Sequence, residues 1–122
     1  MGLDGTIRRA DGEPLGNLAA VQHVIAEAFP GIVFGRLPSG DEKIRAAAEQ
    51  GVIFPDIIRE SLQRTPAQHG GEFKCPDFSA SFNLGAAETV QQVQVLLYGK
   101  TTASEPMFGV LEKRFGWITT HP

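Results

Sequence analysis

The sequence predicts an α+β protein, a two-layer sandwich in which helices pack on one face of a small, mostly antiparallel sheet. Residues 78–84 and 93–97 alternate apolar and polar side chains, as half-buried strands do, and a short connection joins them into a hairpin. Segments 17–29 and 105–115 carry apolar residues at helical spacing instead. The expected sheet has three or four strands, and the expected order is (β)-α-β-α-α-β-β-α.

The chain begins with a Gly-rich segment, 1–16, which is expected to be a loosely attached N-terminal piece of one globular domain, 1–122. The sequence leaves open whether this segment pairs with the sheet. The first helix is then predicted over 17–29. Asn17 suits its N-cap, and Pro30 ends it.

A short buried strand is predicted over 32–37, between glycine and proline. Ser39 and Glu42 follow at capping-box spacing and predict the start of a helix over 41–50. Gly51 suits the position just after the end of that helix.

Pro55 is expected to open another short helix that runs to Leu62, with Ile57, Ile58 and Leu62 pointing inward. This middle pair of helices would pack at one end of the sheet or form an excursion from it. Residues 65–71 are rich in glycine and polar residues and are predicted to form a mobile loop.

The second strand of the hairpin loses its alternation at Leu96 and Tyr98, which predicts that it is covered on both faces there. The last helix is predicted to begin near Ser104 with a proline in its first turn, and to end at Gly116. Residues 117–118 add a short extended piece.

Composition excludes several classes of function. The hydrophobic fraction of 42% and the charged fraction of 20% describe an ordinary globular protein rather than a disordered chain. The formal net charge of −3, without a basic run, argues against nucleic acid as a partner. The apolar runs are too short for a membrane span, and the single Cys75 excludes an internal disulfide. We therefore expect a cytoplasmic protein without a membrane partner.

Catalytic and metal-binding patterns are weak. The three histidines and the one cysteine do not stand at the spacing of known metal motifs, so no metal or other cofactor is expected. Cys75 lies beside Lys74 and follows His69 and Glu72. These three residues, His69, Glu72 and Cys75, form the candidate pocket of an enzyme or small-ligand binder, placed near the 65–77 loop. The overall balance of these patterns favours a protein that is not an enzyme.

The outward face of the 78–98 hairpin is the more informative feature, because it is polar and carries no charge. Its residues form the candidate interface: Ser79, Ser81, Asn83, Gln92 and Gln94. A neutral, hydrogen-bonding sheet face suits contact with another protein or with a second copy of the chain. The leading hypothesis is a small protein-interaction module, such as an adaptor, an inhibitor or a neutralising partner. A small-ligand pocket and a homodimer joined through the hairpin remain alternatives.

Overall fold

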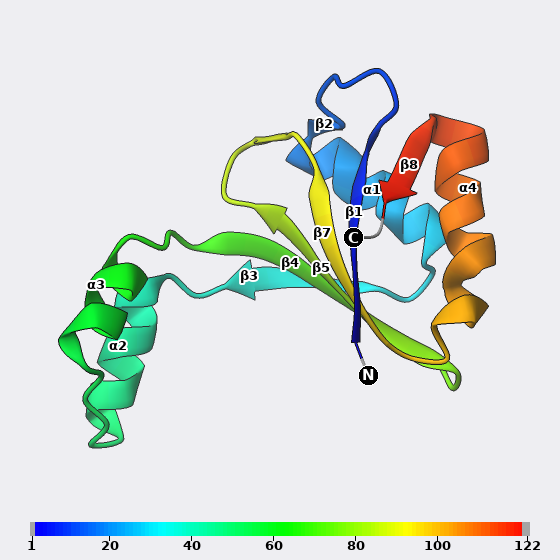
Figure 1. Cartoon of the computed structure of the whole chain (residues 1–122). Coiled ribbons are helices and arrows are strands. Elements are labelled where there is room, and N and C mark those ends of the chain that lie inside the picture. Colours follow the sequence, from blue (N-terminus) through cyan, green and yellow to red (C-terminus); the bar gives the residue numbers. More distant parts are fainter. Residues whose placement is uncertain (1, 121–122) are drawn as a thin grey trace.

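The computed structural model describes residues 2–120 and confirms an α+β fold with an antiparallel sheet. The sheet order is β3-β4-β5-β7-β1-β8, and every neighbouring pair is antiparallel (Figure 1). The six strands are β1 (Gly2–Arg9), β3 (Val33–Leu37), β4 (Gln68–Lys74), β5 (Phe78–Gly85), β7 (Val93–Gly99) and β8 (Trp117–Thr120). The helices are α1 (Leu18–Ala28), α2 (Gly40–Glu49), α3 (Asp56–Gln63), the 3₁₀ turn η1 (Thr101–Ser104) and α4 (Glu105–Phe115).

The sheet is larger than the three or four strands that the sequence predicts. The prediction of a mobile loop over 65–71 is wrong, because most of this segment belongs to β4, a central strand that pairs with β3 and β5. The N-terminal segment enters the sheet as β1, which pairs on both sides, with β7 and β8. The 117–118 piece extends to a full edge strand, β8.

The hydrophobic core lies between α1, α4 and one face of the sheet. Phe29, which is fully buried at the end of α1, sits at its centre. Its ring meets those of Phe73, Phe82 and Phe108 edge-on, with centroid distances of 5.4, 5.0 and 5.3 Å. Such T-shaped pairs add to the free energy gained from burial alone. The cluster thus joins β4, β5 and both covering helices.

The helix ends follow the predicted signals. The Asn17 side chain accepts a hydrogen bond of 2.9 Å from the Ala20 N–H at the start of α1. The Ser39 hydroxyl accepts one of 3.2 Å from the Glu42 N–H at the start of α2. Gly116 ends α4 in the left-handed conformation, at φ 70°. These local predictions are confirmed because capping depends on residues close in sequence.

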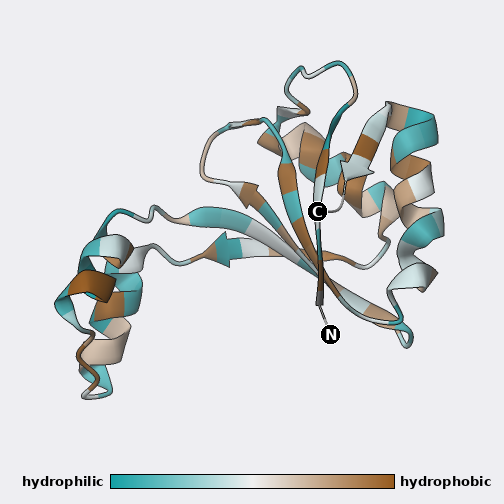
Figure 2. Cartoon of the chain, in the orientation of Figure 1, coloured by the Kyte–Doolittle hydropathy of each residue, from teal (hydrophilic) through white to brown (hydrophobic). Residues whose placement is uncertain are grey.

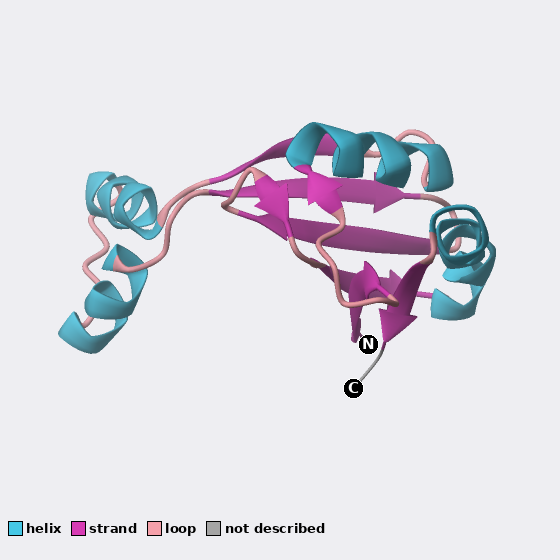
Figure 3. Cartoon of the chain, turned by 90° about the horizontal axis from the view of Figure 1, so that it is seen from above, coloured by secondary structure: helices cyan, strands magenta, loops and turns pink. Residues whose placement is uncertain are grey.

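Helices α2 and α3 form an arm that projects from the ends of β3 and β4, away from α1 and α4 (Figures 1 and 3). The predicted inward packing of Ile57 and Ile58 is wrong, since their exposed fractions are 78% and 45%. Ile53, in the connection between the two helices, is 79% exposed. Figure 2 shows these apolar segments on the arm. The arm therefore carries apolar side chains that no other part of the described chain covers.

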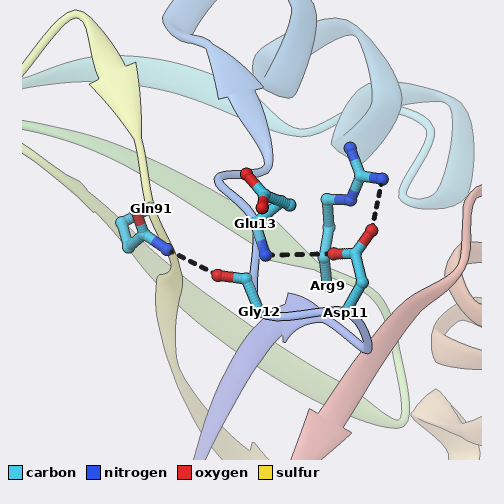
Figure 4. Close-up of polar contacts among 5 residues, drawn as sticks. All are labelled: Arg9, Asp11, Gly12, Glu13 and Gln91. Carbon is cyan, nitrogen blue, oxygen red and sulfur yellow. Dashed lines mark hydrogen bonds and ion pairs between the residues drawn. The ribbon is translucent and has the colours of Figure 1, made fainter.

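The short strands β2 (Gly16–Asn17) and β6 (Thr89–Val90) pair with each other and fasten the β1–α1 connection to the β5–β7 connection. Within this region Asp11 organises a turn (Figure 4). Its carboxylate accepts a 3.0 Å hydrogen bond from the Glu13 N–H and a 2.7 Å contact from Arg9. The Glu13 N–H, and then Arg9, lower the pKa of Asp11. The Gln91 amide donates to the Gly12 carbonyl at 3.3 Å.

Candidate functional site

The face of the sheet opposite α1 and α4 carries no helix, and we call it the open face. The strand register places side chains there in rows that cross the sheet. One row runs from Asp4 on β1 through Leu96, Ser81 and Glu72 to Val33 on the edge strand β3. Successive members of such a row lie about 5 Å apart. The open face therefore brings together residues from five strands that are far apart in sequence.

The open face is hollowed near its β3 side. The hollow has a volume of about 670 Å³ and spans β3, β4, β5, β7 and β1. Its apolar wall includes Val33, Leu37 and Leu96, and its polar side chains include Ser81, Asn83 and Gln94. A volume of this size lies within the range of about 300–1,000 Å³ that is typical of ligand sites.

Two glycines form part of the floor of this hollow. Gly35 on β3 lies opposite Gly70 on β4, and both line the hollow. Neither has a positive φ, so the backbone does not require glycine at either position. At Gly70 a Cβ would come within 3.1 Å of the Leu37 side chain, whereas at Gly35 it would meet no atom within 4 Å. The lack of a side chain at Gly35 keeps this end of the hollow open.

The polar side chains of the open face are held by cross-strand hydrogen bonds. The Ser81 hydroxyl lies 2.8 and 2.9 Å from the two carboxylate oxygens of Glu72, to which it donates. The Asn83 amide donates to Gln68 at 2.7 Å. The Thr6 hydroxyl donates to the Gln94 side-chain oxygen at 3.2 Å. These bonds fix the orientation of the groups before any partner arrives, which lowers the entropy lost on binding.

An ion pair holds the arm at the end of β3. The Arg36 guanidinium contacts the Glu42 carboxylate through two nitrogens, one of them at 2.8 Å. This hydrogen-bonded pairing lowers the pKa of Glu42, and Glu42 raises the pKa of Arg36. The charge of Arg36 is thereby engaged within the chain, on a residue that borders the hollow.

The structure separates the five predicted interface residues. Ser81, Asn83 and Gln94 line the hollow together. Ser79 lies further along β5, opposite Tyr98, and lines a shallow depression with it. Gln92 precedes β7 and lies outside the strand.

The sequence predicts that the second hairpin strand is covered on both faces near Tyr98. No described residue covers it there, since the Tyr98 side chain is 44% exposed. The open face as a whole is also not free of charge. Glu72 on β4 and Asp4 on β1 flank the hairpin within one row. A sequence view of the hairpin alone misses both residues, because their strands are joined to it only by tertiary pairing.

The three candidate pocket residues lie in different parts of the described sheet and its connections. Glu72 lines the hollow, while Cys75 lines the shallow depression beside Pro76 and Asp77. His69 and Glu72 are three residues apart on β4, so their side chains point to opposite faces of the sheet. Cys75 is half-buried and packs against the core.

The structure adds site residues that the sequence did not single out. Val33, Gly35 and Leu37 of β3 border the hollow, and Gly70 forms its floor. The sequence predicts a buried strand here, and that prediction is wrong: Val33 is 70% exposed, because β3 is the edge of the sheet. The signal available in the sequence was the glycine in the middle of a short strand, which often marks close approach of another group.

Comparison with known proteins finds no match for this chain among protein-family models, curated proteins or solved structures. Within residues 2–120, no three His, Cys, Asp or Glu residues are grouped so that they could hold a metal ion. No helix in the described part of the chain has the length and apolar character needed to cross a membrane.

Proposed function

We propose that this chain is a protein-interaction module that binds its partner through the open face of the sheet. The observation that carries the proposal is the hollow of about 670 Å³, where Ser81, Asn83 and Gln94 lie among the apolar side chains of β3 and β7. Protein interfaces commonly combine an apolar centre with hydrogen-bonding groups around it.

The exposed surface of the arm supports the same proposal. Ile53 and Ile57 are almost four-fifths exposed, and Val52 is half exposed. Large apolar side chains gathered in this way are a common mark of contact surfaces in soluble proteins. The arm begins at the end of β3, and β3 borders the hollow. A partner that covers the hollow therefore also lies close to the arm.

The charges of the open face indicate the chemistry of the partner. Glu72 lines the hollow, and Arg36, the basic residue among the described residues that line it, is paired with Glu42. The hollow therefore favours a partner segment that carries lysine or arginine beside apolar side chains, because opposite charges attract across an interface.

Affinity capture of the tagged protein from the lysate of its source cells, compared between the wild type and two variants, tests the proposal. Gln94→Lys places a long cation inside the hollow, and Gln92→Lys places the same group outside it. We expect a stoichiometric partner with the wild type and with Gln92→Lys, and at least a tenfold loss of binding with Gln94→Lys. Equal capture by both variants would contradict binding in the hollow.

A small-molecule ligand is the second candidate, favoured by the volume of the hollow. A thermal-shift screen separates the two functions. A compound that raises Tm for the wild type but not for Gln94→Lys would support the small-molecule function, whereas no shift combined with partner capture would support the interaction module.

A further inference from the structure

We propose that β3 pairs with β3 of a second copy of this chain, in antiparallel orientation about a two-fold axis at Gly35. The inference goes beyond the proposed function, since it concerns the edge of the sheet rather than its open face. It begins from the position of β3, which is the first strand in the sheet order and, among the residues that the structure describes, pairs with β4 alone. Its outer side therefore presents backbone N–H and C=O groups that can accept another strand.

The edge lacks the usual protection against pairing. Residues 33–37 include neither lysine nor proline, and the charge of Arg36 is engaged by Glu42. The arm extends beyond the end of β3 (Figure 1). Val33, at 70% exposure, shows that the first part of the strand is open to solvent.

The register of this pairing explains why the strand added to β3 is β3 of a second copy of the chain. Gly35 is the central residue of β3, so a two-fold axis there places Gly35 opposite the partner's Gly35. Val33 then faces the partner's Leu37, and Leu37 faces the partner's Val33, on the open face. Both pairs are apolar, and both residues are exposed in the single chain. The segment Val-Phe-Gly-Arg-Leu is thus complementary to itself in this register.

The pairs on the other side of the strand fit as well. Phe34 faces the partner's Arg36, so that no two like charges lie opposite each other in this register. Glycine opposite glycine leaves no side chain between the two copies at the axis. This also gives a reason for Gly35, which neither its φ nor a neighbouring atom requires.

The pairing would complete the hollow. Val33, Gly35 and Leu37 form its border at the sheet edge. In the pair, the partner's Leu37 lies next to Val33 and continues that border, so that each hollow is lined by both copies. The alternative of a homodimer through an edge of the 78–98 hairpin has no free edge to use, since β5 and β7 are paired on both sides.

The mass of the protein in solution tests this proposal directly. Sedimentation equilibrium is expected to give about twice the 13.1 kDa of the chain for the wild type. Gly35→Glu and Gly35→Lys place like charges opposite each other at the axis, and each is expected to give monomers. A Cβ at Gly35 meets no atom of its own chain within 4 Å, so a side chain can leave the backbone there without a clash. Thr120→Glu, an exposed position on the opposite edge strand β8, is the matched control and should stay dimeric.

Mixing the two charged variants tests the register. An equimolar mixture of Gly35→Glu and Gly35→Lys pairs opposite charges at the axis, and we expect it to recover the dimer mass. A wild type that stays monomeric up to about 100 μM would overturn the proposal, because a dimer that needs a higher concentration binds too weakly to be specific. A dimer that persists in Gly35→Glu, or a mixture that stays monomeric, would overturn the register. None of these results depends on whether the hollow binds a different protein.

A cysteine pair provides a second measurement that is independent of charge. In a Cys75→Ser background, Gly35→Cys is expected to form an intermolecular disulfide under mild oxidation, because residues opposite each other are about 5 Å apart. Val33→Cys should not, since the two Val33 positions are offset by four residues, or about 13 Å. Equal cross-linking of both variants would contradict the axis at Gly35.

Discussion

Gly35 on the edge strand β3 lies directly opposite Gly70 on β4, and the two residues leave part of the floor of the hollow without side chains. The pair lowers the free energy of unfolding, because glycine within a strand removes side-chain packing and adds conformational freedom to the unfolded chain. At Gly70 the cost is offset by the close approach of the Leu37 side chain. At Gly35 no atom of the chain occupies the space, which is why we assign that space to a binding partner.

The joint between the two helices of the arm depends on Gly40. A Cβ at this position would overlap the Leu62 carbonyl oxygen, and backbone cannot move aside cheaply. We expect Gly40→Ala to separate α2 from α3, with a local cost of about 1–3 kcal/mol or more. Amide hydrogen exchange should show lost protection in residues 40–63, while the strands keep theirs.

Gly109→Ala on α4 is the control for that change, because a Cβ there meets nothing within 4 Å. Replacing a helical glycine by alanine should stabilise the protein by about 0.5–1 kcal/mol. If Gly40→Ala left the exchange of the arm unchanged, the close contact between α2 and α3 would be contradicted.

The apolar side chains of the arm are expected to contribute little to folding. Ile57→Lys changes a residue that is 78% exposed, so the free energy of unfolding should stay within about 0.5 kcal/mol of the wild type. Ile25→Ala, at a fully buried position of α1, should cost about 2–5 kcal/mol. Urea unfolding measures both. A large loss of stability in Ile57→Lys would show that this side chain is covered within the chain.

Removal of the cap of α1 has a predictable effect. Asn17→Ala deletes the side chain that accepts from the Ala20 N–H, and the expected cost is about 1 kcal/mol. Asn17→Asp keeps an acceptor at the same position and should restore most of the stability. If the alanine and aspartate variants unfolded at the same urea concentration, the capping bond would contribute nothing measurable.

The turn at Asp11 should make the stability of the protein depend on pH in the acid range. The pKa of Asp11 is lowered in the folded protein, first by the Glu13 N–H and then by Arg9, so folding favours the ionised carboxylate. Its contribution is present above the ordinary value of 3.8 and is lost as the pH falls through the lower, folded value. We therefore expect the stability difference between the wild type and Asp11→Asn to shrink below about pH 3.8.

An NMR titration of the Asp11 carboxyl carbon checks the cause directly. Its midpoint should lie below 3.8 in the folded protein. A midpoint at or above that value would contradict the hydrogen bond from Glu13.

Elements with strong local signals could be predicted from the sequence. The alternation in β5 and β7 and the caps at Asn17 and Ser39 each depend on residues within a few positions of one another. Strand β4 was missed because the consecutive glycines Gly70 and Gly71 are typical of loops. In the fold those glycines are needed for contact, since Cβ atoms there would press on Leu37 and Phe34.

Only part of the candidate site could be predicted from the sequence. Ser81, Asn83 and Gln94 lie on strands with clear alternation, and their common face follows from that alternation. Glu72 and Val33 join the same row through pairing between β3, β4 and β5, which no local pattern encodes. The amphipathic pattern around Ile57 predicted burial, but an amphipathic helix does not reveal whether its apolar side meets the core or solvent.

The most direct test of the account is a hydrogen-exchange footprint of the captured complex against the chain alone. Protection upon binding should appear in β5 and β7, with the strongest change around Ser81, Asn83 and Gln94. The outer surfaces of α1 and α4 should be unchanged. Protection confined to α1 and α4, with no change in β5 or β7, would contradict the assignment of the open face as the interaction site.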